Sequence, residues 1–265
     1  MAKTTRPLVG ISRCLLGEPV RYDGAHKHDR TLIEAFTPFV EWVPICPEVE
    51  AGFGIPREPM HLVSDTGSAQ APRLLTIQTQ QDRTEALVRA AARRLREFRR
   101  LNLSGYIFKS GSPSCGLADV PISDRRSRPR RPGAGLFAAA VTRALPLIPV
   151  ADERQLRSLR HRRAFLERLI GHREWLDFKA SRPARTGLLT FHARQRDRLF
   201  ARDPSRAHRL DALVSRAIGR SGSKATALLK TYERLFCETL AIPLTNRVGR
   251  PHLKKPPVRQ RRQNR

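Results

Sequence analysis

The sequence of 265 residues predicts an α/β domain with an open, mainly parallel sheet, followed by an all-α helical domain. Up to about residue 150, short apolar runs alternate with segments of helical period, which is typical of a parallel sheet with helices packed on it. Beyond that point every apolar pattern is helical, and the short connections indicate a bundle. We therefore expect a sheet domain over 1–150, a helical domain over 151–246 and a tail over 247–265.

Four short runs rich in apolar and β-branched residues predict buried strands, because each is followed by turn-forming residues. The runs are Leu8–Ser12, Trp42–Cys46, Leu74–Gln78 and Gly105–Lys109. Between them, Asp82–Leu101 has apolar residues on one face and arginines on the other, which predicts an amphipathic helix. Gly135–Leu145 predicts another.

The second half predicts helices alone. Asp152 is expected to begin the first, because acidic residues suit the positive end of a helix. Leu188–Ala201 predicts the second helix, and Asp203 caps a third that opens at Pro204. Ser223–Ala241 has the most regular apolar spacing, and Pro243 ends it.

Charge is unevenly distributed along the chain. The formal net charge is +27 at pH 7, of which residues 1–150 contribute +8 and residues 151–265 contribute +19. An excess this large repels itself unless anions neutralise it, so we expect a nucleic acid as partner, with a steep salt dependence. An arginine cluster over 125–131 is broken by prolines and predicts a loop, and the basic, proline-rich tail over 247–265 predicts disorder.

Composition also excludes several classes of protein. No apolar run approaches the length of a membrane span, and Met1–Gly10 lacks the apolar core of a secretory signal, so we expect a cytoplasmic protein. In a reducing compartment, the four cysteines are better candidates for metal binding or catalysis than for disulfides.

Three of the cysteines, Cys14, Cys46 and Cys115, stand at or just beyond the end of a predicted strand. Ligands bind at the carboxyl ends of parallel strands, so these thiols are expected to meet in one crevice. The chain has no CxxC pair, which argues against a zinc ribbon. Three thiolates without a fourth suit an iron-sulfur cluster with one open iron, although burial as small apolar residues remains an alternative. Cys237, inside the last predicted helix, is assigned to packing.

Five motifs in order make the first half resemble the thiouracil desulfidase family over most of residues 6–150. They are Cys14-Leu15-Leu16-Gly17, Arg21-Tyr22-Asp23-Gly24, Cys46-Pro47-Glu48-Val49, Gly54-Ile55-Pro56-Arg57-Glu58-Pro59, and Gly105–Lys109 running into Ser112-Pro113-Ser114-Cys115-Gly116. The segment 152–246, with Phe165-Leu166-Glu167-Arg168 and Phe191-His192, resembles the helical domain fused to such modules in bacterial tRNA 4-thiouridine desulfidases. Those domains continue with further helices, so a shortened domain is expected here.

The resemblance implies a 4Fe-4S cluster held by Cys14, Cys46 and Cys115, whose open iron takes the sulfur of a thiolated base. Water then replaces sulfur with oxygen without net redox change. Glu48, two residues after a cluster ligand, is the carboxylate best placed to act as the base; a surface or capping role is its alternative.

The remaining site residues have two interpretations each. Ser112 and Ser114 could donate hydrogen bonds to developing charge, or serve only as turn residues. Arg21, Asp23 and Lys109 are candidate substrate contacts. Arg21 with Asp23, and Arg57 with Glu58, could instead form ion pairs that brace their loops.

Our preferred hypothesis is an enzyme that converts 4-thiouridine in tRNA to uridine, with chemistry in the first domain and tRNA binding in the second. The first alternative is a desulfidase of free thiouracil, for which the strongly basic second half would be superfluous. The second is a non-enzymatic basic RNA-binding protein with structural cysteines.

Overall fold

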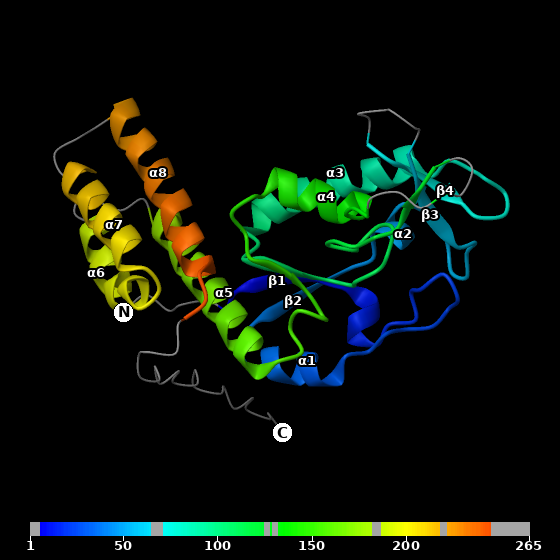
Figure 1. Ribbon diagram of the computed structural model, residues 1–265, viewed down its shortest axis with the longest axis horizontal. Helices are drawn as coiled ribbons and strands as arrows, with labels where there is room; N and C mark the ends of the chain where they lie inside the picture. The colour runs from blue at the N-terminus through cyan, green and yellow to red at the C-terminus, as the bar shows by residue number, and fades with distance from the viewer. Residues whose placement is uncertain are drawn as a thin grey trace, which may run out of the picture.

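The computed structural model describes residues 6–64, 71–124, 128, 132–181, 187–217 and 222–244. A sheet-bearing half is followed by a helical half, as Figure 1 shows, so the predicted fold class is confirmed. The predicted tail and most of the predicted arginine-rich loop lie outside the described residues. Within the described part of the chain, none of the helices combines the length and apolar character required to cross a bilayer.

The main sheet has four strands, all parallel, in the order β2-β1-β5-β7. Its strands are β1 (Leu8–Ser12), β2 (Glu41–Ile45), β5 (Gly105–Phe108) and β7 (Val150–Asp152). Ile11 lies between Pro44 and Ile107 in the register, so the carboxyl ends of β2, β1 and β5 are aligned. The loops that follow these strands therefore share one edge of the sheet.

Both faces of the sheet are covered by helices, which explains why its strands are apolar on both sides. Alternation along β5 sends Tyr106 and Phe108 to one face and Ile107 to the other. The first face packs against helices α3 (Thr84–Leu101) and α4 (Leu136–Ala144). The second packs against α1 (Arg30–Phe36) and the start of α5 (Leu159–Ala180), on the opposite side of the sheet in Figure 1.

A second, smaller sheet has the order β4-β3-β6. It consists of β3 (Met60–Val63), β4 (Arg73–Thr76) and β6 (Ile122–Ser123). The strand predicted at residues 74–78 is present as β4, in this second sheet and not in the main one. β4 instead pairs antiparallel with β3, because the connection between them is too short for the crossover that a parallel pair requires.

The helical half contains α5, α6 (Gly187–Phe200), α7 (Pro204–Ala217) and α8 (Gly222–Ala241). α6, α7 and α8 begin within one residue of their predicted starts. The first helix does not begin at Asp152, because β7 continues through that residue and its carboxylate accepts a hydrogen bond from Gln155 N at 2.9 Å. Ser158 caps α5 instead, accepting from His161 N at 3.2 Å.

Helix α5 belongs to two hydrophobic cores. Near its start, Phe165 meets Phe36 of α1 at a ring-centroid distance of 6.0 Å. Further along, Trp175 is fully buried in the helical core, 5.3 Å from the ring of Tyr232 on α8. A single helix thus packs in both halves. The strand before it, β7, begins at Val150 and continues to Asp152, so it spans the boundary expected between residues 150 and 151.

Candidate active site

A pocket of about 340 Å³ lies at the carboxyl edge of the main sheet, and the side chains of Cys14, Cys46 and Cys115 all line it. Cys14 is in the 3-10 helix η1 (Arg13–Leu16), which follows β1 directly. Cys46 is the N-cap of α2 (Pro47–Glu50), which follows β2, and Cys115 is in the loop after β5. Cys14 and Cys115 are buried, and Cys46 is half-buried.

Local backbone contacts fix the loop of each cysteine. Gly17 ends η1 with a φ of +93°, a conformation that favours glycine, and donates its N–H to Cys14 O. Cys46 Sγ donates a weak hydrogen bond to Val20 O at 3.8 Å. Ser112 Oγ accepts from Cys115 N at 3.1 Å, which closes a tight turn around this cysteine.

Burial raises the pKa of all three thiols, that of Cys14 to about 11. The thiols also oppose each other's ionisation: charge on Cys46 raises the pKa of both Cys14 and Cys115. Such a trio is stable as thiolates only when a cation compensates the charge, since metal binding displaces thiol protons.

The described residues contain no group of three His, Cys, Asp or Glu side chains placed to hold one metal ion. The three cysteines share the lining of one pocket.

Glu48 also lines the pocket, in the first turn of α2, and is 9% exposed. Arg57 contacts one oxygen of its carboxylate, Oε2, through Nε at 2.8 Å and Nη2 at 2.6 Å. Arg57 Nη1 also donates to the carbonyl oxygens of Val20 (3.1 Å) and Gly54 (3.0 Å). This buried, well-bonded arginine fixes the position of the carboxylate.

The ion pair between Arg57 and Glu58 suggested by the sequence does not form. Arg57 binds Glu48 instead, and Glu58 has other partners. Its carboxylate instead accepts from Thr79 N at 2.8 Å and Thr79 Oγ1 at 2.6 Å.

The structure separates the two candidate serines. Ser112 lines the pocket, and its oxygen accepts from the backbone N–H groups of Ser114 (3.2 Å) and Cys115 (3.1 Å). Its O–H therefore remains available to donate. Ser114 is fully buried and is not part of the pocket lining, and its Oγ has no hydrogen-bond partner in the described part of the protein.

Lys109 and Arg21 line the pocket, whereas Asp23 does not. Arg21 contacts Asp23 at 3.3 Å, and both side chains are partly exposed, so their ion pair is not the buried one considered from the sequence. The N–H of Ala25 and the guanidinium of Arg21 lower the pKa of Asp23.

Lys109 is held by Glu153, which the sequence analysis did not single out. Glu153 accepts from Lys109 Nζ at 2.7 Å and from Ser110 N at 2.8 Å, so it ties the end of β7 to the loop that carries Cys115. Burial acts to raise the pKa of Glu153, but the bonds from Lys109 and Ser110 outweigh it and the pKa lies below its ordinary value. The available signal was that Glu153 follows a strand at the same sheet edge.

Ser12 is a second residue that the sequence analysis missed. It is buried at the end of β1, lines the pocket, and accepts from Lys109 N at 3.0 Å. Its position as the last residue of a predicted strand was the available signal.

Comparisons with known proteins identify the region that carries this pocket. Over 139 residues the chain is 32% identical to the uncharacterized protein YbbK of Bacillus subtilis. The matched region makes up 52% of this chain and 91% of YbbK. The solved structure of the 4Fe-4S-dependent thiouracil desulfidase TudS is 27% identical in sequence; the match covers 57% of this chain and 93% of that one, with a TM-score of 0.45.

The family model described as 2-thiouracil desulfurase matches residues 9–153. This match contains β1, β2, β5 and β7 of the main sheet, all three pocket cysteines, Glu48 and Glu153. The chain belongs to the 2-thiouracil desulfurase family.

Proposed function

We propose that this protein is an iron-sulfur-dependent desulfidase that replaces the sulfur of a thiolated pyrimidine with oxygen, and that its substrate is 4-thiouridine in tRNA. The observation that carries the proposal is the single pocket lined by Cys14, Cys46, Cys115 and Glu48. Membership of the 2-thiouracil desulfurase family supports the reaction. The overall change is hydrolytic: a C–O bond forms from water, the C–S bond breaks, and sulfur leaves as sulfide.

The three thiols fit a 4Fe-4S cluster. They are soft ligands and they share one pocket. When bound through three cysteines, such a cluster supplies one open iron as a Lewis acid for the soft sulfur of a thiocarbonyl group. All remaining steps belong to residues of the chain.

Glu48 is the proposed general base. Arg57 binds Oε2 of this carboxylate, and Oε1 has no hydrogen-bond partner among the residues that the structure describes. Oε1 can therefore accept a proton from a water molecule in the pocket as that water attacks the carbon that carries sulfur in the thiolated pyrimidine. Arg57 keeps the carboxylate aimed at the pocket throughout.

Ser112 and Lys109 are proposed to stabilise negative charge that develops as the C–S bond weakens. Ser112 can donate its hydroxyl, because its oxygen already accepts two backbone N–H groups that hold it in place. Lys109 supplies a positive charge at the pocket wall, fixed by Glu153. Fixed donors of this kind act without reorganisation during the reaction. Ser114, being buried outside the lining, is assigned to the fold.

Arg21 is the proposed substrate contact at the pocket entrance, with Asp23 positioning its guanidinium. A pocket of about 340 Å³ is at the small end of ligand sites and accommodates one base rather than a stretch of nucleic acid. The thiolated base would therefore have to be turned out of its stack to react.

The formal net charge of +19 on residues 151–265 supports tRNA over a free base as substrate. A neutral thiouracil would not be bound more tightly by positive charge that lies outside the pocket. A free thiopyrimidine is the second candidate, and the small pocket favours it.

The test is anaerobic sulfide release by the cluster-loaded protein from thiolated tRNA and from free 2-thiouracil. We expect release from tRNA to be the faster, and Cys46→Ser to abolish both cluster absorbance and sulfide release. Cys237→Ser is the matched control, because Cys237 lies on α8 outside the pocket.

Iron-free protein after reconstitution, or full activity of the Cys46 variant, would contradict the proposal. Turnover of free 2-thiouracil with none of tRNA would leave the chemistry standing and refute the substrate.

A further inference from the structure

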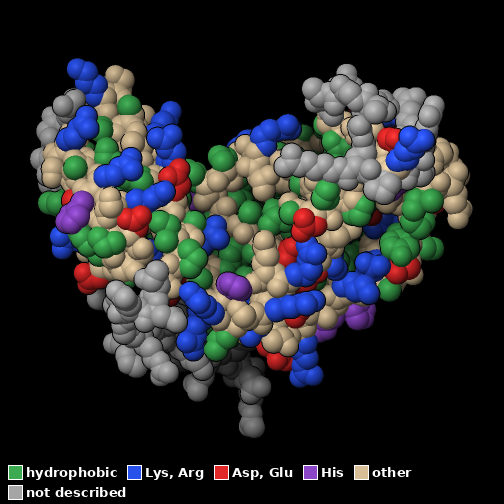
Figure 2. All heavy atoms as spheres, in the orientation of Figure 1, with side chains coloured by type: hydrophobic (Ala, Val, Ile, Leu, Met, Phe, Trp, Pro, Cys, Tyr) green, Lys and Arg blue, Asp and Glu red, His purple; other side chains and the backbone are tan. Residues whose placement is uncertain are grey.

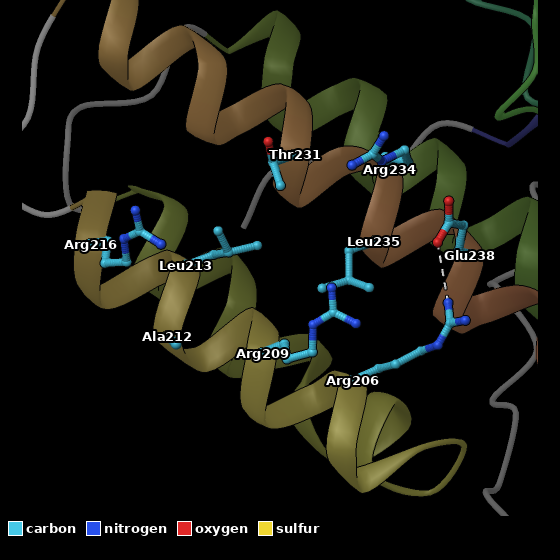
Figure 3. A pocket seen from close by; sticks show the side chains of 9 residues that line it. All are labelled: Arg206, Arg209, Ala212, Leu213, Arg216, Thr231, Arg234, Leu235 and Glu238. Atoms are coloured by element: carbon cyan, nitrogen blue, oxygen red, sulfur yellow. Dashed lines mark hydrogen bonds and ion pairs between the residues drawn. The ribbon is translucent and has the colours of Figure 1, made fainter.

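A second pocket, far along the chain from the cysteines, lies between helices α7 and α8. Its volume is about 380 Å³, and arginine side chains dominate its lining: Arg206, Arg209 and Arg216 from α7 and Arg234 from α8. Figure 3 shows Arg206 and Arg209 extending from α7 toward α8, where they face Glu238 and Leu235. We call this pocket the arginine groove.

The helical repeat explains why the arginines share one groove. Arg209 and Arg216 are seven residues apart, which is two turns of helix, so both lie on the face of α7 that is turned to α8. Seven residues rise about 10 Å along the helix axis, so the positive charge forms a row rather than a point.

Among the residues that the structure describes, three of the four guanidinium groups have no anionic partner. Arg206 forms ion pairs with two carboxylates, those of Glu238 at 3.2 Å and Asp203 at 3.5 Å. For Arg209, Arg216 and Arg234, the described part of the protein provides no ion pair or hydrogen-bonded acceptor. Unpaired cations in one groove repel each other, and a bound anion relieves that repulsion.

The lining also indicates what kind of anion fits. Guanidinium groups match phosphate oxygens in pairs of parallel hydrogen bonds. Leu213 and Leu235 make an apolar floor. Besides the arginines, the polar side chains of the lining are Thr231, which donates to Ala227 O at 3.0 Å, and Glu238, which is bound by Arg206. The groove thus has the chemistry for contacts to a phosphodiester backbone, which position a nucleic acid without reading its sequence.

The position of the groove separates it from the candidate active site. In Figure 1, α7 and α8 lie at the left end of the molecule and α2, which borders the cysteine pocket, lies at the right. Figure 2 shows Lys and Arg side chains gathered over the helices at the left. One free base cannot occupy both places, but an extended polyanion can contact both.

We infer that the arginine groove binds the phosphate backbone of the RNA substrate through Arg209, Arg216 and Arg234, and anchors it while one base enters the cysteine pocket. The inference rests on the proposed function for its choice of RNA, and on the groove itself for the contact.

The test measures binding of unmodified bulk tRNA to the full-length protein without its cluster, over a range of salt concentrations. The groove variant carries Arg209→Gln, Arg216→Gln and Arg234→Gln. The matched variant carries Arg96→Gln, Arg99→Gln and Arg100→Gln, which removes the same charge from exposed positions on α3.

We expect the groove variant to bind tRNA at least about tenfold more weakly, with a log–log salt slope smaller by about 2–3, since each phosphate contact contributes about 0.7–0.9. The α3 variant should change both values much less. Equal losses in the two variants, or wild-type binding by the groove variant, would overturn the inference. Duplex DNA of similar length bound more tightly than tRNA would overturn the choice of RNA.

These outcomes are independent of the proposed chemistry, because no thiolated base or cluster is present. Desulfidation of free 2-thiouracil by the cluster-loaded groove variant should remain at the wild-type rate, and this readout reports the chemistry alone.

Discussion

The two halves of this molecule use charge in opposite ways. In the sheet half, two charged pairs at the pocket are largely buried: Arg57 is bound to Glu48, and Lys109 to Glu153. In the helical half, three arginines of one groove are exposed and have no partner among the described residues. An ion pair fixes the positions of its two side chains, whereas uncompensated positive charges attract an anionic ligand. The contrast suggests chemistry in the first half and capture of a polyanion in the second.

The largest expected effect concerns the paired carboxylate of the sheet half. We expect Glu48→Gln to lower sulfide release by about 10²–10⁴-fold, because an amide cannot accept the proton of the attacking water. Cluster absorbance should be unchanged, since the substitution keeps the shape of the side chain. The measurement is the initial rate of anaerobic sulfide release.

Glu58→Gln is the control for this prediction. Glu58 is buried less, binds the backbone near Thr79 and does not line the pocket, so its variant should keep the wild-type rate. Equal rates for Glu48→Gln and wild type would show that the paired carboxylate only supports the fold.

The second prediction tests the contact between the halves. A Cβ on Gly105 would lie 2.2 Å from Leu169 Cδ2 of α5 and 2.8 Å from Pro149 O. Because a backbone oxygen cannot move aside cheaply, we expect Gly105→Ala to lower the free energy of unfolding by about 3 kcal/mol. Denaturant titration followed by circular dichroism measures it.

The neighbouring residue provides the control. Ser104 is fully buried, and its Oγ has no hydrogen-bond partner in the described part of the chain. Ser104→Ala should therefore leave stability unchanged or raise it slightly. A similar loss in both variants would mean that the segment is sensitive to any change, and not that α5 approaches Gly105 closely.

The third prediction uses pH to examine the same contact. Burial, with a contribution from Lys179, lowers the pKa of His172 on α5 from 6.5 to about 4. The unfolded chain therefore binds a proton at this site at a higher pH than the folded protein does. Stability is fully present above pH 6.5 and falls towards pH 4, by about 2–3 kcal/mol over that window.

His172→Leu should lose less stability than wild type between pH 7 and pH 4, in denaturant titrations at both pH values. The difference between the two proteins isolates this histidine from the carboxylates that titrate in the same range. An identical pH profile for wild type and His172→Leu would refute the prediction.

The smallest expected effect is the difference between the unfolding midpoints of the two halves, which we expect to be near zero. The chain has two tryptophans, Trp42 on β2 in the sheet half and Trp175 in the helical core. Because α5 packs in both cores, we expect the halves to unfold together. Fluorescence of Trp42→Phe reports the helical half, and that of Trp175→Phe reports the sheet half.

Each single-tryptophan variant carries its own control, since circular dichroism of the same sample should give the same midpoint as fluorescence. Two separate transitions in one variant would show that the halves are independent folding units.

Much of this contrast could be read from the sequence. Helical period gave α3, α6, α7 and α8 nearly to the residue, because each has one apolar face against a core. β1 matched its expected range because a buried parallel strand is a continuous apolar run. The shared pocket of the three cysteines followed from one rule about strand ends.

Other features depend on contacts that no local pattern contains. The pairing of Arg57 with Glu48 joins residues nine positions apart across a turn, and a sequence shows only that Glu58 is adjacent. The tie between Glu153 and Lys109 needs β7 beside β5, and β7 is only three residues long. The arginine groove requires two helices to face each other, which neither helix specifies alone.

The dual packing of α5 has a consequence for anyone who wants a minimal enzyme. A fragment ending at residue 153, where the family match stops, would strip Phe165 and Leu169 from the sheet and leave Phe36 bare. We expect such a fragment to aggregate, because a large apolar patch would be exposed to solvent. The helical half thus covers apolar surface of the half that carries the cysteine pocket, and we expect neither half to stay folded when it is separated from the other.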